Sequence, residues 1–179
     1  MMYEDISEIV FTETDLYDMV CRIAERINED YANEEILLVG LLKGSVVFIT
    51  DLMRKITLPC SLDFMAVSSY GNSTKSNGVV NVKMDLTQEI EGKNVLIVED
   101  IIDSGNTLYA VLKLLESRNP RSLKLASLLS KPDRREKDIK IDYLGAETDD
   151  VFVVGYGLDY AEKYRNLPYI GILKPEVYL

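Results

Sequence analysis

An apolar run that ends in carboxylates constrains this chain more than any other segment. Residues 95–98 (Val-Leu-Ile-Val) have the composition of a strand that is buried on both faces in a parallel sheet. Glu99 and Asp100 follow at once, and from about Asn106 apolar residues recur at helical spacing as far as Asn119. The turn between strand and helix is therefore expected at the carboxyl edge of the sheet, where open α/β proteins bind their ligands.

Small and hydroxylated residues occupy this turn. Ser104, Gly105 and Thr107 leave backbone N–H groups uncovered at a helix start, where they favour a phosphate. The adjacent carboxylates of Glu99 and Asp100 would repel each other unless a cation or sugar hydroxyls lay between them. The pattern predicts a sugar phosphate with Mg²⁺ on hard oxygen ligands. The alternative is a solvated acidic turn in which Ser104 caps the helix. No Gly-Lys-Ser/Thr follows, which excludes a P-loop, and the glycine spacing excludes a dinucleotide fingerprint.

The absence of histidine restricts the possible chemistry. The 179 residues include none, which excludes Ser-His-Asp and Cys-His catalysis and zinc held by imidazole. The 20 basic and 30 acidic residues give a net charge of −10, which argues against nucleic acid or an anionic membrane surface as a partner. Cys21 and Cys60 lack metal or redox spacing and are expected to be reduced. With an acidic N-terminus and no apolar run of transmembrane length, we expect a cytoplasmic protein.

Strand and helix patterns alternate along the chain. Thr14 is expected to cap a first helix, and the small, polar residues 68–78 are expected to form a mobile loop. Further helices are expected after Ser45 and Gly105. The predicted strands are residues 36–41, 62–67, 79–86, 95–98, 123–129, 141–144, 152–154 and 170–173. This alternation predicts an α/β fold, a mainly parallel twisted sheet with helices on both faces, in a single domain over residues 1–179.

Several motifs resemble the type I phosphoribosyltransferases, which use phosphoribosyl diphosphate (PRPP). Residues 99–105 (Glu-Asp-Ile-Ile-Asp-Ser-Gly) resemble the PRPP signature of their 6-oxopurine branch. The other motifs of that branch occur in the expected order: Leu42-Lys43-Gly44-Ser45, Ser68-Ser69-Tyr70-Gly71, Lys131 with Phe152 to Asp159, and Arg165-Asn166-Leu167-Pro168-Tyr169 with the ending Lys174-Pro175-Glu176-Val177-Tyr178. The last set is similar to the bacterial hypoxanthine phosphoribosyltransferases, and the resemblance covers essentially the whole chain.

The resemblance implies how PRPP would be held. Glu99 and Asp100 would engage the ribose hydroxyls and one Mg²⁺, and Asp159 would bind a second Mg²⁺. The 5-phosphate would be surrounded by Asp103, Ser104, Gly105, Asn106 and Thr107. The diphosphate would be bound by Lys43, Gly44 and Arg165. Family members often hold the peptide that precedes this lysine in the cis form.

The resemblance also implies a purine pocket with a cover over it. The pocket would contain Lys131, Phe152, Val153 and Asp159. Phe152 would stack on the purine, and the backbone of Val153 would read its polar edge. Asp103 would be the base near N7, since the chain offers no histidine. A hood made of the lid hairpin and the terminal segments, and a mobile lid at Ser69 and Tyr70, would exclude water.

The predicted function is purine salvage, in which the 5-phosphoribosyl group of PRPP is transferred to N9 of hypoxanthine and of guanine. The resemblance implies Mg²⁺ as the cofactor and a homo-oligomer, either a dimer or a tetramer. One alternative is a phosphoribosyltransferase for another base, such as xanthine, adenine or a pyrimidine. The other is a non-catalytic PRPP-binding regulator. Such a regulator should carry a basic face or a DNA-binding segment, and a net charge of −10 argues against the first.

Overall fold

The computed structural model describes residues 2–69 and 80–179 and follows the alternation of strands and helices along the chain. In order, its elements are η1 (Met2–Asp5), β1 (Ile6–Phe11), α1 (Glu13–Asp30), β2 (Ile36–Leu41), α2 (Val46–Met53), β3 (Cys60–Ser69), β4 (Val80–Met84), β5 (Asn94–Ile102), α3 (Asn106–Glu116), β6 (Ser122–Ser130), η2 (Pro132–Arg134), β7 (Tyr143–Glu147), β8 (Val153–Val154), β9 (Ile170–Leu173) and α4 (Pro175–Tyr178).

The main sheet has six strands in the order β4-β3-β2-β5-β6-β7. All neighbouring pairs are parallel except β3 and β4, which form an antiparallel pair at one edge. The predicted mainly parallel sheet is therefore confirmed, and so is the antiparallel strand expected within residues 79–86. Strands β2 and β5 lie at the centre, where their carboxyl ends reach the same edge.

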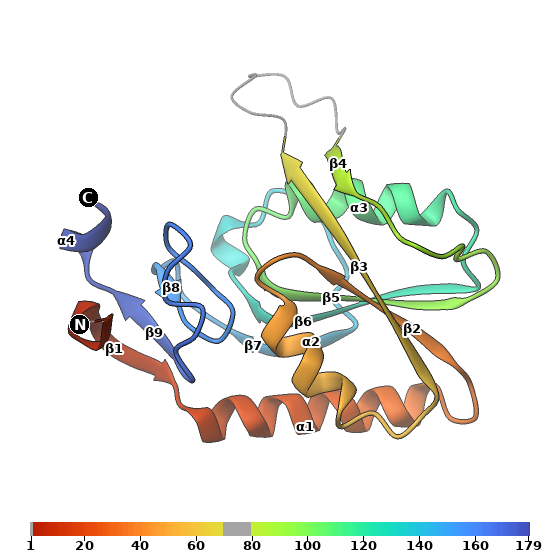
Figure 1. Cartoon of the computed structure of the whole chain (residues 1–179), viewed down its shortest axis with the longest axis horizontal. Coiled ribbons are helices and arrows are strands. Elements are labelled where there is room, and N and C mark those ends of the chain that lie inside the picture. Colours follow the sequence, from red (N-terminus) through yellow and green to blue (C-terminus); the bar gives the residue numbers. More distant parts are fainter. Residues whose placement is uncertain (1, 70–79) are drawn as a thin grey trace.

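Helices cover both faces of this sheet (Figure 1). Helices α1 and α2 pack on one face and α3 on the other. The side chains of β5 alternate between the two cores: Leu96 and Val98 pack with α1 and α2, whereas Val95 and Ile97 pack with α3. A strand buried on both faces explains why its sequence reads as a continuous apolar run.

A second, three-stranded sheet forms the hood, with the antiparallel order β1-β9-β8. It lies at one end of the main sheet, and the first and last described segments, η1 and α4, adjoin its strands β1 and β9 (Figure 1). The terminal segments thus contribute to the hood as predicted. The expected contribution of the lid hairpin is wrong, because β3 and β4 extend the main sheet instead. No helix in the described ranges is both long and apolar enough to cross a membrane.

Two local predictions are corrected by the structure. The cap of α1 is Thr12 rather than Thr14; the Thr12 hydroxyl accepts from the Asp15 N–H, and the Asp15 carboxylate accepts from the Thr12 N–H at 2.8 Å. The central strand does not end at Val98, because β5 continues to Ile102. Glu99 and Asp100 therefore belong to a strand and not to a solvated turn.

Candidate active site

Glu99 and Asp100 lie near the carboxyl end of β5, three and two residues before its last residue, the buried Ile102. Atom Oε2 of Glu99 is buried and has no hydrogen-bond partner among the described residues. Burial, reinforced by the neighbouring Asp100 carboxylate, raises the pKa of Glu99 well above its usual range. Burial likewise raises the pKa of Asp100 to about 6. Because burial penalises the charged form of each carboxylate, each of them favours a nearby cation or hydroxyl donor.

The turn after β5 forms a small anion cradle. Gly105 is the N-cap of α3 and has φ +80°, a left-handed conformation that glycine adopts without a steric penalty. The N-cap is therefore Gly105 and not Ser104, although the Ser104 hydroxyl accepts a long hydrogen bond, 3.4 Å, from the Asn106 N–H. A cavity of about 170 Å³ opens here; it is lined by Glu99 and by residues 101–108. Uncovered N–H groups and the helix dipole make it suited to a phosphate.

The loop after β6 holds this turn in place. The Glu136 N–H donates to the Ser104 carbonyl at 2.9 Å, and Arg135 Nε donates to the Asp103 carbonyl at 3.2 Å. Asn106 Nδ2 donates to the Glu136 carboxylate at 2.7 Å, which directs the Asn106 side chain toward the loop after β6. Sequence reasoning missed Arg135 and Glu136, because their role depends on a loop folding back over the turn.

A second cavity, of about 250 Å³, lies beside the first. The side chains predicted for the purine pocket gather around it; the lining residues are Asp100, Ile101, Asp103, Lys131, Phe152, Val153, Leu158 and Asp159. Asp103 lines both cavities and so lies at their junction. The structure thus brings together residues that are separated by more than fifty positions in the chain.

Lys131 is only 7% exposed, although it opens a strongly charged loop. Its Nζ lies 3.9 Å from Asp150 Oδ1, which in turn contacts Arg134 at 3.2 Å. Arg134 Nε lies 3.1 Å from Asp103 Oδ1. A chain of alternating charges therefore links the predicted base to the predicted purine-binding lysine. Asp150 and Arg134 carried no signal in the sequence that would have assigned them to the site.

The loop between β2 and α2 reaches the carboxylates from the neighbouring strand. A Cβ added to Gly44 would lie 1.7 Å from Asp100 Oδ2, so only glycine allows this approach. The Gly44 carbonyl in turn lies against Gly157 of the loop between β8 and β9. The peptide between Leu42 and Lys43 is cis. Three segments that are distant in sequence thus converge beside Asp100.

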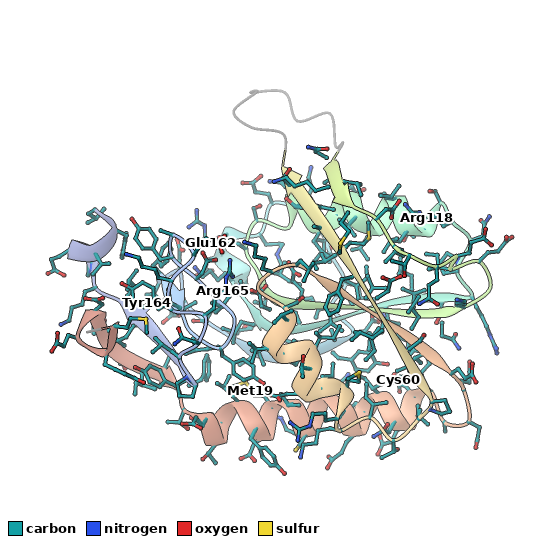
Figure 2. The ribbon with its side chains drawn as sticks, in the orientation of Figure 1. Met19, Cys60, Arg118, Glu162, Tyr164 and Arg165 are labelled. Carbon is teal, nitrogen blue, oxygen red and sulfur yellow. The ribbon has the colours of Figure 1, made fainter. Side chains whose placement is uncertain are left out.

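The predicted diphosphate-binding cations meet at a residue that sequence reasoning missed. Glu162 Oε2 lies 3.0 Å from Lys43 Nζ and 3.5 Å from Arg165 Nη2. Arg165 Nη2 also lies 2.9 Å from Asp159 Oδ1, so the predicted metal ligand and the predicted diphosphate contact are paired with each other. Figure 2 shows Glu162 and Arg165 on the loop that connects β8 and β9, on the side of the hood toward the main sheet. The hydrogen bond from the Lys43 ammonium is the main cause that lowers the pKa of Glu162 below its usual value.

We expect Glu162→Gln to lower the KM for PRPP by up to about fivefold, because the carboxylate occupies the cations that the diphosphate is predicted to use, and exposed ion pairs are weak. Steady-state kinetics with varied PRPP and calorimetry with PRPP measure the effect. The matched control is Glu116→Gln, which breaks an ion pair of similar exposure on α3. An increase in the KM for PRPP would instead mean that Glu162 positions the two cations for the substrate.

The predicted lid begins where the first described range, residues 2–69, ends. Ser69 is the last residue of β3, and Tyr70 lies outside the described residues. Strand β3 is adjacent to β2, so this strand ends at the same edge of the sheet as the loop that contains Lys43. The lid assignment of Ser69 and Tyr70 therefore stays a prediction.

The donor set at this edge fits Mg²⁺ that arrives with its substrate. No three acidic or cysteine side chains of the described ranges are grouped closely enough to form a metal cage. Mg²⁺ typically uses one or two carboxylates together with substrate phosphates and water. Glu99 and Asp100 match that requirement, because they supply two carboxylates and because Oε2 of Glu99 is buried without a hydrogen-bond partner among the described residues.

The chain is similar to known proteins over most of its length. The phosphoribosyl transferase domain model matches residues 9–161. The chain is 48% identical to the hypoxanthine-guanine phosphoribosyltransferase of Staphylococcus aureus and 49% identical to that of Staphylococcus epidermidis, in each case over 99% of both chains. A crystal structure of a hypoxanthine phosphoribosyltransferase from Staphylococcus aureus superposes with a TM-score of 0.96 at 48% identity, over 99% of this chain and 97% of that chain.

A further solved structure is similar over nearly the same length. It is a hypoxanthine-guanine phosphoribosyltransferase from Bacillus anthracis, with a TM-score of 0.91 and 44% identity over 94% of this chain and 99% of that chain; a HEPES molecule lies in its active site. The family model covers most of this chain, and the full-length relatives exceed 40% identity. The chain therefore belongs to the phosphoribosyl transferase domain family.

Proposed function

We propose that this protein transfers the 5-phosphoribosyl group of PRPP to N9 of hypoxanthine and of guanine, with release of diphosphate. One observation carries the proposal: the second cavity gathers Asp103, Lys131 and Phe152 directly beside the anion cradle at the start of α3. A base in one cavity and a ribose phosphate in the other would meet at Asp103. Full-length relatives bear the name of this activity.

The residues divide the reaction between them. Backbone N–H groups at the start of α3 and the hydroxyls of Ser104 and Thr107 would hold the 5-phosphate. Glu99 and Asp100 would accept hydrogen bonds from the ribose hydroxyls and orient the sugar. Lys43 and Arg165 would stabilise the charge that develops on the departing diphosphate. Asp103 would take, or hold through a hydrogen bond, the proton of the purine near N7.

Bound Mg²⁺ would supply positive charge at the ribose hydroxyls and at the diphosphate, beyond what Lys43 and Arg165 provide. Glu99 and Asp100 would hold one ion and Asp159 a second, directly or through water. Because Asp159 is paired with Arg165 at 2.9 Å, a metal ion held by Asp159 would compete with this ion pair for the carboxylate.

An assay of the purified protein with PRPP, Mg²⁺ and one purine base tests the proposal. We expect hypoxanthine to yield IMP and guanine to yield GMP, with one diphosphate released for each nucleotide formed. Parallel reactions with xanthine and adenine define which bases are accepted. Efficient turnover of xanthine alone would favour the alternative base, and tight calorimetric binding of PRPP without turnover of any base would favour a regulator.

A further inference from the structure

Three aromatic rings meet at the edge of the hood, close to the end of the chain. Tyr178 stacks on Phe152, with ring centroids 4.9 Å apart and planes inclined at 24°. Tyr160 contacts the same phenylalanine edge-on, at 5.6 Å and 88°. Tyr160 and Tyr178 are themselves 6.4 Å apart. Two tyrosines from separate segments therefore hold one phenylalanine ring.

Phe152 is the one member of this cluster that lines the predicted purine cavity. Phe152 lines the cavity that also contains Asp103 and Lys131, whereas Tyr160 and Tyr178 are not among its lining residues. The Phe152 ring has two faces, and Tyr178 covers one of them. A flat ligand in the cavity can therefore stack only on the opposite face, and Phe152, which is still 36% exposed, has surface free for it.

Backbone contacts fix Tyr178 in this place. The Leu173 N–H donates to the Phe152 carbonyl at 2.9 Å, so β9 is tied directly to the stacking residue. The Lys174 N–H donates to the Asp5 carbonyl at 2.9 Å, which ties the start of α4 to the N-terminal segment. Tyr178 thus approaches Phe152 from a turn that is anchored at both sides of the hood.

We propose that Tyr178 is a positioning residue for the purine base, acting through Phe152. The inference rests on the proposed function. A stacked ring behind Phe152 keeps its plane in the orientation that the base requires, so rotamer freedom is lost during folding rather than during binding. The last turn of the chain would then determine affinity for the base without contacting it.

The test compares ligands that contain the base with one that lacks it. We expect Tyr178→Ala to raise the KM for hypoxanthine and the calorimetric Kd for IMP by about threefold to tenfold, the effect of losing one aromatic pair. The Kd for PRPP should stay unchanged, because PRPP has no base. Tyr178→Phe, which keeps the ring, should have the same KM for hypoxanthine and Kd for IMP as the unaltered protein. Tyr178→Leu, which fills the space without a ring, should show the same increase in both as Tyr178→Ala.

The matched control is Tyr3→Ala, which removes a tilted aromatic contact with Tyr169 elsewhere in the hood, at 6.3 Å. Equal weakening of IMP and PRPP by Tyr178→Ala, or an unchanged Kd for IMP, would overturn the inference. If Tyr178→Ala fails to fold in a thermal melt, the comparison of Tyr178→Phe with Tyr178→Leu decides in the same way. Absence of both IMP formation and IMP binding in the unaltered protein would instead refute the proposed function.

Discussion

Replacing Asp103 with asparagine is expected to lower kcat by roughly 10²- to 10⁴-fold while leaving the fold and the affinity for PRPP intact. Asp103 lines both cavities, so its carboxylate lies where a ribose and a base would meet. Asparagine has the same shape and can still accept a hydrogen bond from Arg134, which contacts the carboxylate at 3.1 Å. What it cannot do is accept a proton from the purine.

Single-turnover kinetics with hypoxanthine and calorimetry with PRPP separate chemistry from binding in this variant. Asp133→Asn is the matched control, because it removes a neighbouring carboxylate that lines neither cavity. A reduction of roughly 10²- to 10⁴-fold would support a role for Asp103 in taking the purine proton or holding it through a hydrogen bond. Near-normal turnover would exclude both roles.

The main sheet could be predicted because its residues carry strong local signals. Ile36–Leu41 is apolar throughout and is buried throughout, so its bounds were predicted to the residue. The hood strand Ile6–Phe11 was missed. It pairs with only one of the described strands, the pairing register shifts twice, and all six of its side chains are at least partly exposed. Neither alternation nor a continuous apolar run therefore marks it.

Sequence motifs predicted the site residues. The residues that contact them could not be predicted, because those contacts depend on the path of the loops. Glu162 reaches Lys43 and Arg165 because the loop between β8 and β9 places Ala161, Glu162 and Tyr164 at positive φ. Residues other than glycine rarely adopt this conformation, and no local pattern predicts it. Tyr178 was likewise part of a recognised ending, but its stack on Phe152 depends on β9 pairing with both β1 and β8.

Replacement of Lys131 should change which purine the protein accepts. A lysine ammonium has three donors and no acceptor, so it can pair with the 6-oxo group of hypoxanthine or guanine and not with the 6-amino group of adenine. Lys131 is buried, and its nearest carboxylate, Asp150, lies 3.9 Å from Nζ, beyond hydrogen-bond distance. An unpaired buried polar group costs about 1–3 kcal/mol, and more when it is charged. Discrimination against adenine should therefore be on the order of 10³-fold in kcat/KM.

Lys131→Met keeps most of the bulk of the stem and removes the charge. We expect a sharp decrease in kcat/KM for hypoxanthine and a smaller ratio between hypoxanthine and adenine, because adenine no longer faces an ammonium of like polarity. The matched control is Lys137→Met, an exposed lysine of the same loop. Steady-state kinetics with both bases at saturating PRPP give the two ratios. If Lys131→Met and Lys137→Met leave the ratio equally unchanged, base recognition must reside in the backbone around Val153 instead of in the buried ammonium.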